Sequence, residues 1–175
     1  MIVTTLTQTG IRKLYFWCNS LNNLERPQEQ VRSFLTHYLE ISEVVPQVRV
    51  HIRGNKTMFP DDFRSRFEAL ERQTSGNTAF DLYYFLNYST QDDIRRAMEQ
   101  SSPVTLDKVL ERMDEPQNID VIMRTGGNSR LSGFVPLKSP NADVFFVPEY
   151  FPALTPQRIR EAIARGQSRE IRNGF

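Results

Sequence analysis

The stretch Ile119-Asp-Val-Ile-Met-Arg-Thr-Gly-Gly-Asn128 joins a short apolar segment to a polar turn that contains two glycines. An apolar run of this length predicts a buried strand over 119–123. Similar short runs elsewhere alternate with longer amphipathic segments, which is typical of βα units and a mostly parallel sheet flanked by helices. We therefore predict an α/β fold and a single domain over 1–175. The other expected strands are 14–18, 48–52, 80–86 and 142–147, and the expected helices are 27–45, 60–75, 92–98, 105–113 and 155–165.

The composition narrows the class of protein. With 175 residues, a hydrophobic fraction of 39% and a charged fraction of 25%, the chain has the balance of a soluble globular protein. A net charge of +1 argues against a dedicated nucleic-acid-binding protein, which carries a strong basic excess. The single cysteine, Cys18, excludes an internal disulfide framework and favours a reducing compartment. The sequence shows neither an apolar run of membrane-spanning length nor a signal-peptide pattern at its N-terminus.

The loop that follows the 119–123 strand favours a ligand site. Ligands of open α/β sheets bind beyond the carboxyl ends of the strands. Arg124 and Arg130 flank the two glycines, and the hydroxyl of Ser132 follows. Arginine forks, a hydroxyl and backbone N–H groups together form a cradle for a diphosphate or another dianion. The alternative is a tight turn with solvated arginines.

Three further places hold candidates that are weaker on sequence grounds. Asn23 and Arg26 lie in the polar loop after the first expected strand, where they face one crevice or only satisfy the turn backbone. Asp143 stands among the apolar residues of the last strand, either as a Mg²⁺ ligand or as a carboxylate at the strand entrance. The tail Arg172-Asn-Gly174 ends the chain, a position that is usually frayed. The two histidines and the cysteine lack partners at metal-ligand or catalytic spacing, so we expect structural roles for them.

Taken in order, these loops resemble the cis-prenyltransferases, the undecaprenyl diphosphate synthase family. The C-terminal signature of that family reads Asp-hydrophobic-x-hydrophobic-Arg-Thr-Gly-Gly-x-x-Arg-hydrophobic-Ser-x-Phe, and Asp120–Phe134 matches each stated position. The resemblance extends from about Gly10 to Phe175. The other matches are Ser20–Pro27 with Ser-x-Glu-Asn-Trp-x-Arg-Pro, Gly76-Asn-Thr78, Asn87-Tyr88, Asn141–Phe146 with Tyr-Ala-Glu-Leu-Tyr-Phe, and Arg172-Asn-Gly174 with Arg-x-Gly.

The resemblance implies isoprenoid chain elongation, in which isopentenyl diphosphate is condensed with an allylic prenyl diphosphate in the presence of Mg²⁺ to give a cis double bond. In the family, the residues that match Arg124, Arg130 and Ser132 bind the diphosphate of isopentenyl diphosphate. The residues that match Arg172 and Gly174 belong to a tail that closes over the substrate diphosphate. The sequence therefore predicts a diphosphate site at these positions.

The resemblance also implies roles for the remaining candidates. The residues that match Asn23 and Arg26 line the active site as catalytic positions, and the residue that matches Asp143 helps to hold Mg²⁺. The strand 80–86 and the helix 27–45 would line the growing prenyl chain or, alternatively, pack in the core. Family members work as dimers, so we expect a homodimer or a heterodimer with another cis-prenyltransferase subunit, with no nucleic acid as partner. Because long prenyl products partition into membranes, a cytoplasmic place with peripheral membrane contact is expected.

The chain also departs from the family pattern. The family begins with a strand and an Asp-Gly-Asn loop for the primer diphosphate, and we expect the sheet to lack this first strand and the chain alone to be inactive. Leu24 replaces a tryptophan, Asn22 an acidic residue and Ser89-Thr-Gln91 a Gly-Gly-Arg segment. Three hypotheses follow: a cis-prenyltransferase that needs an N-terminal segment or a partner subunit, a non-catalytic subunit of a heteromeric enzyme, or a prenyl diphosphate-binding protein without transferase activity.

Overall fold

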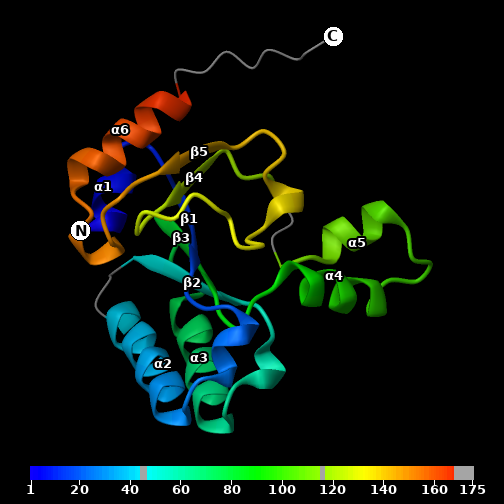
Figure 1. Ribbon diagram of the computed structural model, residues 1–175. Helices are drawn as coiled ribbons and strands as arrows, with labels where there is room; N and C mark the ends of the chain where they lie inside the picture. The colour runs from blue at the N-terminus through cyan, green and yellow to red at the C-terminus, as the bar shows by residue number, and fades with distance from the viewer. Residues whose placement is uncertain (44–46, 115–116, 168–175) are drawn as a thin grey trace. The chain divides into compact units, whose positions relative to one another are not determined.

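The computed structural model describes residues 1–43, 47–114 and 117–167, and the chain divides into two compact units (Figure 1). The first unit is Arg12–Pro116, and the second combines Met1–Ile11 with Gln117–Phe175. Each unit has its own parallel sheet, of three strands in the first and of two in the second.

The sheet of the first unit consists of β1 (Lys13–Trp17), β2 (Val48–Arg53) and β3 (Phe80–Phe85), with β3 in the centre. Parallel strands of one sheet cannot be joined by a tight hairpin and need a crossover connection. Helices α2 (Gln28–Glu43) and α3 (Asp61–Thr74) provide these crossovers, and both lie on the same face of the sheet (Figure 1).

The carboxyl ends of these three strands are level. Trp17 of β1 and Arg53 of β2 both pair with Phe85 of β3, and each is the last residue of its strand. The loops that follow the strands therefore start at one edge of the sheet, the edge at which α/β proteins bind ligands.

The core of the first unit follows from the alternation of side chains along β2 and β3. Every second residue is buried, and α3 adds buried side chains at helical spacing. Apolar side chains removed from water in this way supply most of the stabilising free energy. The buried residues of these elements are Val48, Val50, Ile52, Phe63, Phe67, Leu70, Phe80, Leu82, Tyr84 and Phe85.

Two short helices complete the first unit, α4 (Thr90–Glu99) and α5 (Leu106–Arg112). Ser89 caps α4 by accepting a hydrogen bond from the backbone N–H of Asp92 at 3.2 Å. The two helices pack on each other through a small cluster of their own, made of Ala97, Val109 and Met113 with the partly buried Ile94 and Leu110.

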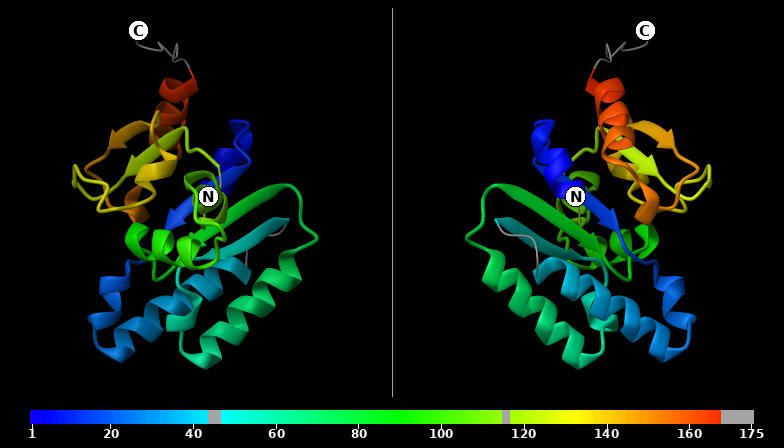
Figure 2. Two further views of the ribbon diagram at one scale, coloured as in Figure 1. Left: turned by 90° about the vertical axis from the view of Figure 1, so that its right-hand side faces the viewer. Right: turned by 90° about the vertical axis from the view of Figure 1, so that its left-hand side faces the viewer.

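The second unit pairs β4 (Val121–Arg124) with β5 (Asp143–Phe146) and contains α1 (Ile2–Gln8) and α6 (Pro156–Gln167). Helices α1 and α6 lie side by side (Figure 2). Helix α6 also packs on β4, where Gly166 approaches the side chain of Val121. The buried apolar side chains of these helices are Leu6, Ile159, Ala162 and Ile163.

The α/β class with parallel strands flanked by helices is confirmed, and the five expected strands are present within a few residues of their predicted bounds. The five strands form two sheets rather than one in the described part of the chain. The single domain over 1–175 stays a prediction. The end of the expected helix 27–45 lies outside the described residues, and α1 was not predicted.

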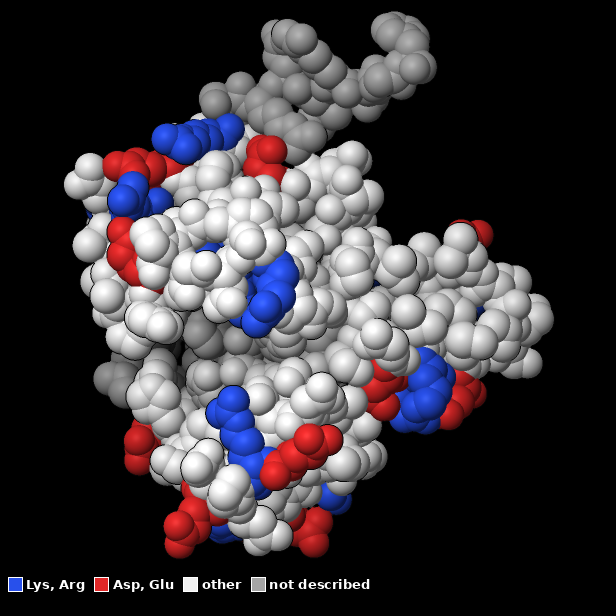
Figure 3. All heavy atoms as spheres, viewed as in Figure 1, with Lys and Arg blue, Asp and Glu red and all other residues white. Residues whose placement is uncertain are grey.

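The charged side chains are mixed in sign on the face seen in Figure 3, where acidic and basic groups lie next to one another. This mixture agrees with the net charge of +1 for the whole sequence. None of the helices in the described ranges is long and apolar enough to cross a lipid bilayer.

Candidate functional site

The turn after β4 is closed by backbone hydrogen bonds. Gly126 and Gly127 have φ angles of 83° and 69°, which glycine adopts at little cost. The N–H of Gly126 donates to the carbonyl of Glu149 at 2.8 Å, and the N–H of Gly127 donates to the carbonyl of Val147 at 3.1 Å. The sequence suggested that backbone N–H groups of this turn face a ligand, but the structure uses these two to bind the segment after β5.

The segment after β5 lies close to this turn. The ring of Tyr150 lies against Gly126, where an added Cβ would be 3.3 Å from Tyr150 Cδ1. Glu149 accepts a hydrogen bond from Arg158 Nε at 3.2 Å through Oε1, while its Oε2 is buried without a hydrogen-bond partner among the described residues. The backbone of Glu149 and the ring of Tyr150 therefore border the turn that follows Arg124.

Arg130 and Ser132 lie farther along the same loop and are exposed, whereas Arg124 at the end of β4 is half-buried. Ser132 has a φ of 53°, in the left-handed region that few residues other than glycine adopt. Strained backbone of this kind is concentrated at functional sites. The loop thus offers the guanidinium group of Arg130 and the hydroxyl of Ser132 to solvent, whereas the guanidinium group of Arg124 is partly buried where the loop begins.

Asp143 lies at the opposite end of the β4–β5 pair from Arg124. It pairs with Val121, whereas Arg124 pairs with Phe146, which places the two residues about 10 Å apart along the strands. In the parts of the chain that the structure describes, no cluster of three or more acidic, histidine or cysteine side chains could hold a metal ion. A single carboxylate suits Mg²⁺ where substrate phosphates supply further ligands, so the oxygen donor of Asp143 is chemically compatible with that ion.

Asn23 and Arg26 belong to the first unit, in and after the 3₁₀ turn η1 (Leu21–Glu25) that follows β1. Ser20 caps this turn, and its backbone N–H and hydroxyl both donate to Asn23 Oδ1, at 3.0 and 3.3 Å. The N–H of Ser20 can only donate, so the Asn23 amide must present its oxygen to Ser20 and direct its NH₂ group elsewhere. The backbone N–H of Arg26 donates to the backbone carbonyl of Asn23 at 3.3 Å, and the Arg26 side chain is exposed.

The predicted site residues are therefore divided between the two units. Arg124, Arg130, Ser132 and Asp143 belong to the second unit, and the Asn23–Arg26 turn belongs to the first. Arg172 and Gly174 lie outside the described residues.

Residues 1–174 match the sequence model of a protein family described as "Putative undecaprenyl diphosphate synthase". The chain belongs to this family. Its resemblance to the cis-prenyltransferases is thereby confirmed. Among curated relatives, an isoprenyl transferase of Agrobacterium fabrum is 30% identical over 186 residues, which cover 94% of this chain and 74% of that protein. The farnesyl-diphosphate-specific ditrans,polycis-undecaprenyl-diphosphate synthase of Shewanella oneidensis is 27% identical over 192 residues, covering 99% of this chain and 70% of that protein.

Two solved structures share the fold of this chain. A probable undecaprenyl diphosphate synthase from Campylobacter jejuni has a TM-score of 0.91 at 22% identity, over 99% of this chain and 88% of that one. The lavandulyl diphosphate synthase from Lavandula x intermedia, solved in complex with dimethylallyl diphosphate, has a TM-score of 0.85 at 19% identity, over 97% of this chain and 81% of that one.

Three asparagines at the carboxyl edge of the first unit's sheet were not among the site residues that the sequence predicted. Asn19, Asn55 and Asn87 each stand two residues after a strand, and all three are buried. Their equal spacing from the strand ends was the signal that could have found them, because buried amides need partners and these strand ends are level. The amide of Asn19 donates to Asn87 at 2.8 Å, and the backbone N–H of Asn55 donates to the Asn87 carbonyl at 3.3 Å.

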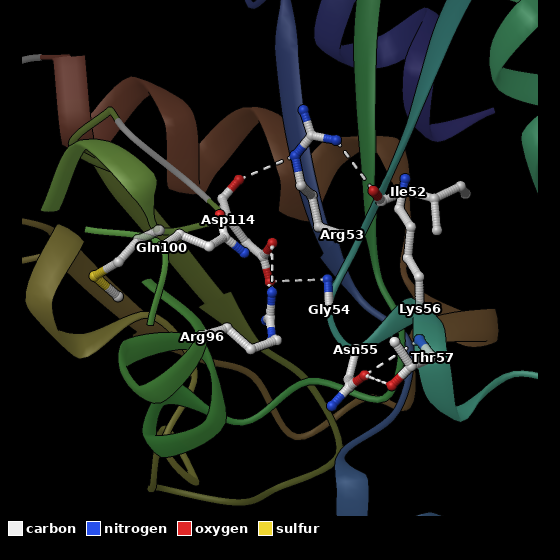
Figure 4. A pocket seen from close by; sticks show the side chains of 10 residues that line it. Ile52, Arg53, Gly54, Asn55, Lys56, Thr57, Arg96, Gln100 and Asp114 are labelled. Carbon is white, nitrogen blue, oxygen red and sulfur yellow. Dashed lines mark hydrogen bonds and ion pairs between the residues drawn. The ribbon is translucent and has the colours of Figure 1, made fainter. Parts of the chain in front are cut away.

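A pocket of about 520 Å³ opens beside the end of β2 (Figure 4). Asp114 is one of the lining residues and accepts hydrogen bonds from the backbone N–H of Gly54 at 2.9 Å and from Arg96 Nη2 at 2.6 Å (Figure 4). Arg53 Nε donates to the Asp114 carbonyl at 3.0 Å, and Lys56 is paired with Glu71 at 2.8 Å. Because these cations already have acceptors within the protein, the pocket is a polar junction rather than a prepared anion site.

Asp93 is hydrogen-bonded to Asp114 and is 1% exposed. Its Oδ1 accepts from the backbone N–H of Asp114 at 3.0 Å, and its Oδ2 accepts from the Tyr88 hydroxyl at 3.3 Å. Burial, and secondly the nearby charge of Asp114, raise the pKa of Asp93 to about 6. The proton on this carboxyl therefore depends on pH within the range of ordinary experiments.

Proposed function

We propose that this chain binds isopentenyl diphosphate on the Arg124–Ser132 loop and takes part in its condensation with an allylic prenyl diphosphate. The observation that supports this proposal is the loop itself, which follows the carboxyl end of β4 and carries two arginines and a left-handed serine. Membership of the undecaprenyl diphosphate synthase family points to the same chemistry.

The proposed reaction depends on charge placed around two diphosphates. Arg124 and Arg130 would hold the diphosphate of isopentenyl diphosphate by forked hydrogen bonds, with the Ser132 hydroxyl as a further donor. The NH₂ group of Asn23 and the Arg26 guanidinium would face the allylic diphosphate. As its carbon–oxygen bond breaks, the leaving diphosphate takes the electron pair, and donors fixed in advance stabilise the developing charge.

The double bond of isopentenyl diphosphate then attacks the allylic carbon, and transfer of a proton from the new cationic intermediate to the released diphosphate restores a double bond. Positioning of the two carbons is the main task of the protein, because a well-oriented pair reacts as if at very high concentration. Mg²⁺, when bound, would neutralise part of the diphosphate charge, and Asp143 would hold it. Magnesium dependence that survives in Asp143→Asn would contradict that role of Asp143.

We also propose that the chain works as a homodimer or with another cis-prenyltransferase subunit, in the cytoplasm and in contact with the membrane surface. The support is the chemistry of the product, whose long apolar chain leaves water. Sedimentation of the purified chain, alone and with liposomes, tests both statements.

The sharpest test of the loop is the binding of isopentenyl diphosphate by calorimetry. Arg130→Lys keeps the charge but loses the fork that matches a phosphate, so we expect affinity to fall about tenfold. The matched control is Arg112→Lys, at an exposed position in α5, which should bind as the wild type does. Equal affinity of the two variants would remove Arg130 from the site.

A second candidate, the non-catalytic subunit, is favoured by the start of α4. Where the family carries Gly-Gly-Arg, this chain has Ser89-Thr-Gln91, and Ser89 serves as the helix cap. Incorporation of radiolabelled isopentenyl diphosphate into farnesyl diphosphate distinguishes the candidates. Turnover by this chain alone supports an enzyme, turnover only with an added catalytic family member supports a subunit, and binding without turnover in either case supports a binding protein.

A further inference from the structure

Asn87 has an unusual backbone conformation for a buried side chain. Its φ is 50°, and its exposed fraction is 0%. Asparagine tolerates the left-handed region better than other residues that carry a Cβ, because its short amide hydrogen-bonds locally. The Nδ2 atom of Asn87 is buried without a hydrogen-bond partner among the described residues, so the amide donor does not explain why an asparagine stands here.

The other atoms of Asn87 form a reciprocal pair with Asn19. Asn19 Nδ2 donates to Asn87 Oδ1 at 2.8 Å, and the backbone N–H of Asn87 donates to Asn19 Oδ1 at 3.2 Å. Backbone bonds continue the connection on both sides, from Tyr88 N–H to the Asn19 carbonyl at 3.2 Å and from Leu21 N–H to the Tyr88 carbonyl at 3.3 Å. The loop after β3 thus holds the loop after β1 through a chain of hydrogen bonds.

This chain of hydrogen bonds leads directly to the proposed site residue Asn23. Asn19 precedes Ser20, and Ser20 fixes the Asn23 amide by two donors to Oδ1. The direction of the Asn23 NH₂ group is therefore set by the position of Ser20, which in turn depends on the pair of Asn19 with Asn87.

We propose that Asn87 is a positioning residue that acts through Asn19 and Ser20 to aim the NH₂ group of Asn23 at an allylic diphosphate. This inference rests on the proposed function, since it takes Asn23 as a diphosphate ligand. Asn87 meets two demands at once, a left-handed backbone and a side-chain oxygen for Asn19. Glycine would meet the first demand alone, which makes Asn87→Gly the informative variant.

The test is a double-mutant cycle on the binding of farnesyl diphosphate to the full chain. Asn23→Asp keeps the oxygen that accepts from Ser20 and loses the NH₂ group, so it breaks ligand binding without breaking the turn. We expect Asn87→Gly to weaken binding about fivefold in the wild-type background and less than twofold in the Asn23→Asp background. Asn87→Asp, which keeps the acceptor for Asn19, should bind within about twofold of the wild type.

Equal weakening in both backgrounds, or no weakening in the wild-type background, would overturn the proposal, because either result shows that Asn87 does not act through Asn23. The control is Asn55→Ala, which removes another buried amide from the same sheet edge and should show no dependence on Asn23. If Asn87→Gly fails to fold, Asn19→Asp breaks the same pair by removing the donor and takes its place in the cycle.

Amide hydrogen exchange separates failure of this inference from failure of the proposed function. Asn87→Gly should raise exchange at the amides of Leu21, Asn23 and Arg26 at least fivefold, whether or not a diphosphate binds. If Asn23→Asp leaves farnesyl diphosphate binding unchanged while amide exchange rises in Asn87→Gly, the proposed role of Asn23 is wrong and the coupling of the two loops stands. Unchanged exchange at these amides in Asn87→Gly would overturn the coupling itself.

Discussion

At the scale of single residues, Asp93 shows how burial sets a titration. Its folded pKa of about 6 lies above the ordinary value for aspartate because burial disfavours the charged form and Asp114 adds like charge. Because the pKa of Asp93 is higher in the folded than in the unfolded state, protonation of this carboxyl stabilises the folded state. This contribution to stability is fully present below about pH 4 and is lost as the pH rises through about 6.

We predict that Asp93→Asn gains stability relative to the wild type as the pH rises. The neutral amide avoids the cost of burying a charge, so the free energy of unfolding of the variant minus that of the wild type should be about 2 kcal/mol more positive at pH 7 than at pH 4.5. Urea unfolding at the two pH values measures this difference. Parallel pH profiles for the two proteins would show that Asp93 does not titrate in this range.

The control for this prediction is the neighbouring Asp92→Asn. Burial alone would raise the pKa of Asp92, but hydrogen bonds from Arg95 and Arg96 outweigh it and hold the pKa below its usual value. A lowered pKa contributes stability above the unfolded value, which is lost only as the pH falls through the folded value. The cost of Asp92→Asn should therefore be nearly the same at pH 4.5 and pH 7.

At the scale of elements, the end of β2 meets the end of β3 at a distance that only glycine permits. Gly54 has a φ of 99°, and a Cβ added there would lie 1.8 Å from the carbonyl oxygen of Leu86. Two backbone hydrogen bonds lie on either side of this contact. The N–H of Leu86 donates to the carbonyl of Arg53 at 2.9 Å, and the N–H of Asn55 donates to the carbonyl of Asn87 at 3.3 Å. The two strand ends are therefore fixed against each other.

We predict that Gly54→Ala lowers the free energy of unfolding by about 3 kcal/mol or more, because backbone strain and a backbone clash add. Gly10→Ala is the matched control, since Gly10 has a φ of 83° but nothing within 4 Å of an added Cβ. That control should cost about 1 kcal/mol, from the left-handed backbone alone. Equal costs in denaturant unfolding would show that the loop after β2 moves away from Leu86 freely.

At the scale of the whole molecule, the chain consists of two compact units whose unfolding can be followed separately. The sequence predicts a single domain over 1–175, and each unit has its own buried apolar side chains. Small single domains unfold in one cooperative step, so a core defect in one unit should destabilise both.

We predict that Phe67→Ala, in the core of the first unit, costs about 3–5 kcal/mol and lowers protection in both units together. Ile159→Ala, in the buried face of α6, should do the same from the other unit. Hydrogen exchange with mass spectrometry reads the units separately. Loss of protection confined to 12–116 in Phe67→Ala would mean that the units are independent domains.

Strands were predictable because their signal is local. The alternation of buried and exposed residues in β2 and the aromatic run of β3 can each be recognised from the few residues of the strand itself. Helix α1 was not predictable, because Ile2, Val3 and the threonines that follow are β-branched residues with low helix propensity. Packing against α6 stabilises it instead, and tertiary packing routinely overrides propensity.

The candidate site divides in the same way. Asp120–Phe134 carries a long ordered motif, and this motif indicates the family through residues that are contiguous in the chain. The use of the Gly126 and Gly127 N–H groups was not predictable, because their partners follow β5 about twenty residues later. Glycine pairs signal a backbone that can turn, and they carry no information about which acceptor it meets.

The sequence by itself determined the α/β class, the places of the strands and the family of the chain, since each depends on residues close together along the chain. Only the tertiary structure decided how the strand ends are joined, through the Asn19–Asn87 pair and the approach of Gly54 to Leu86. Asn19 and Asn87 are 68 residues apart, and a hydrogen bond across that separation leaves no periodic trace in the sequence. Folding brings the two amides together, and burial favours the bond between them because an unpaired polar group is costly away from water.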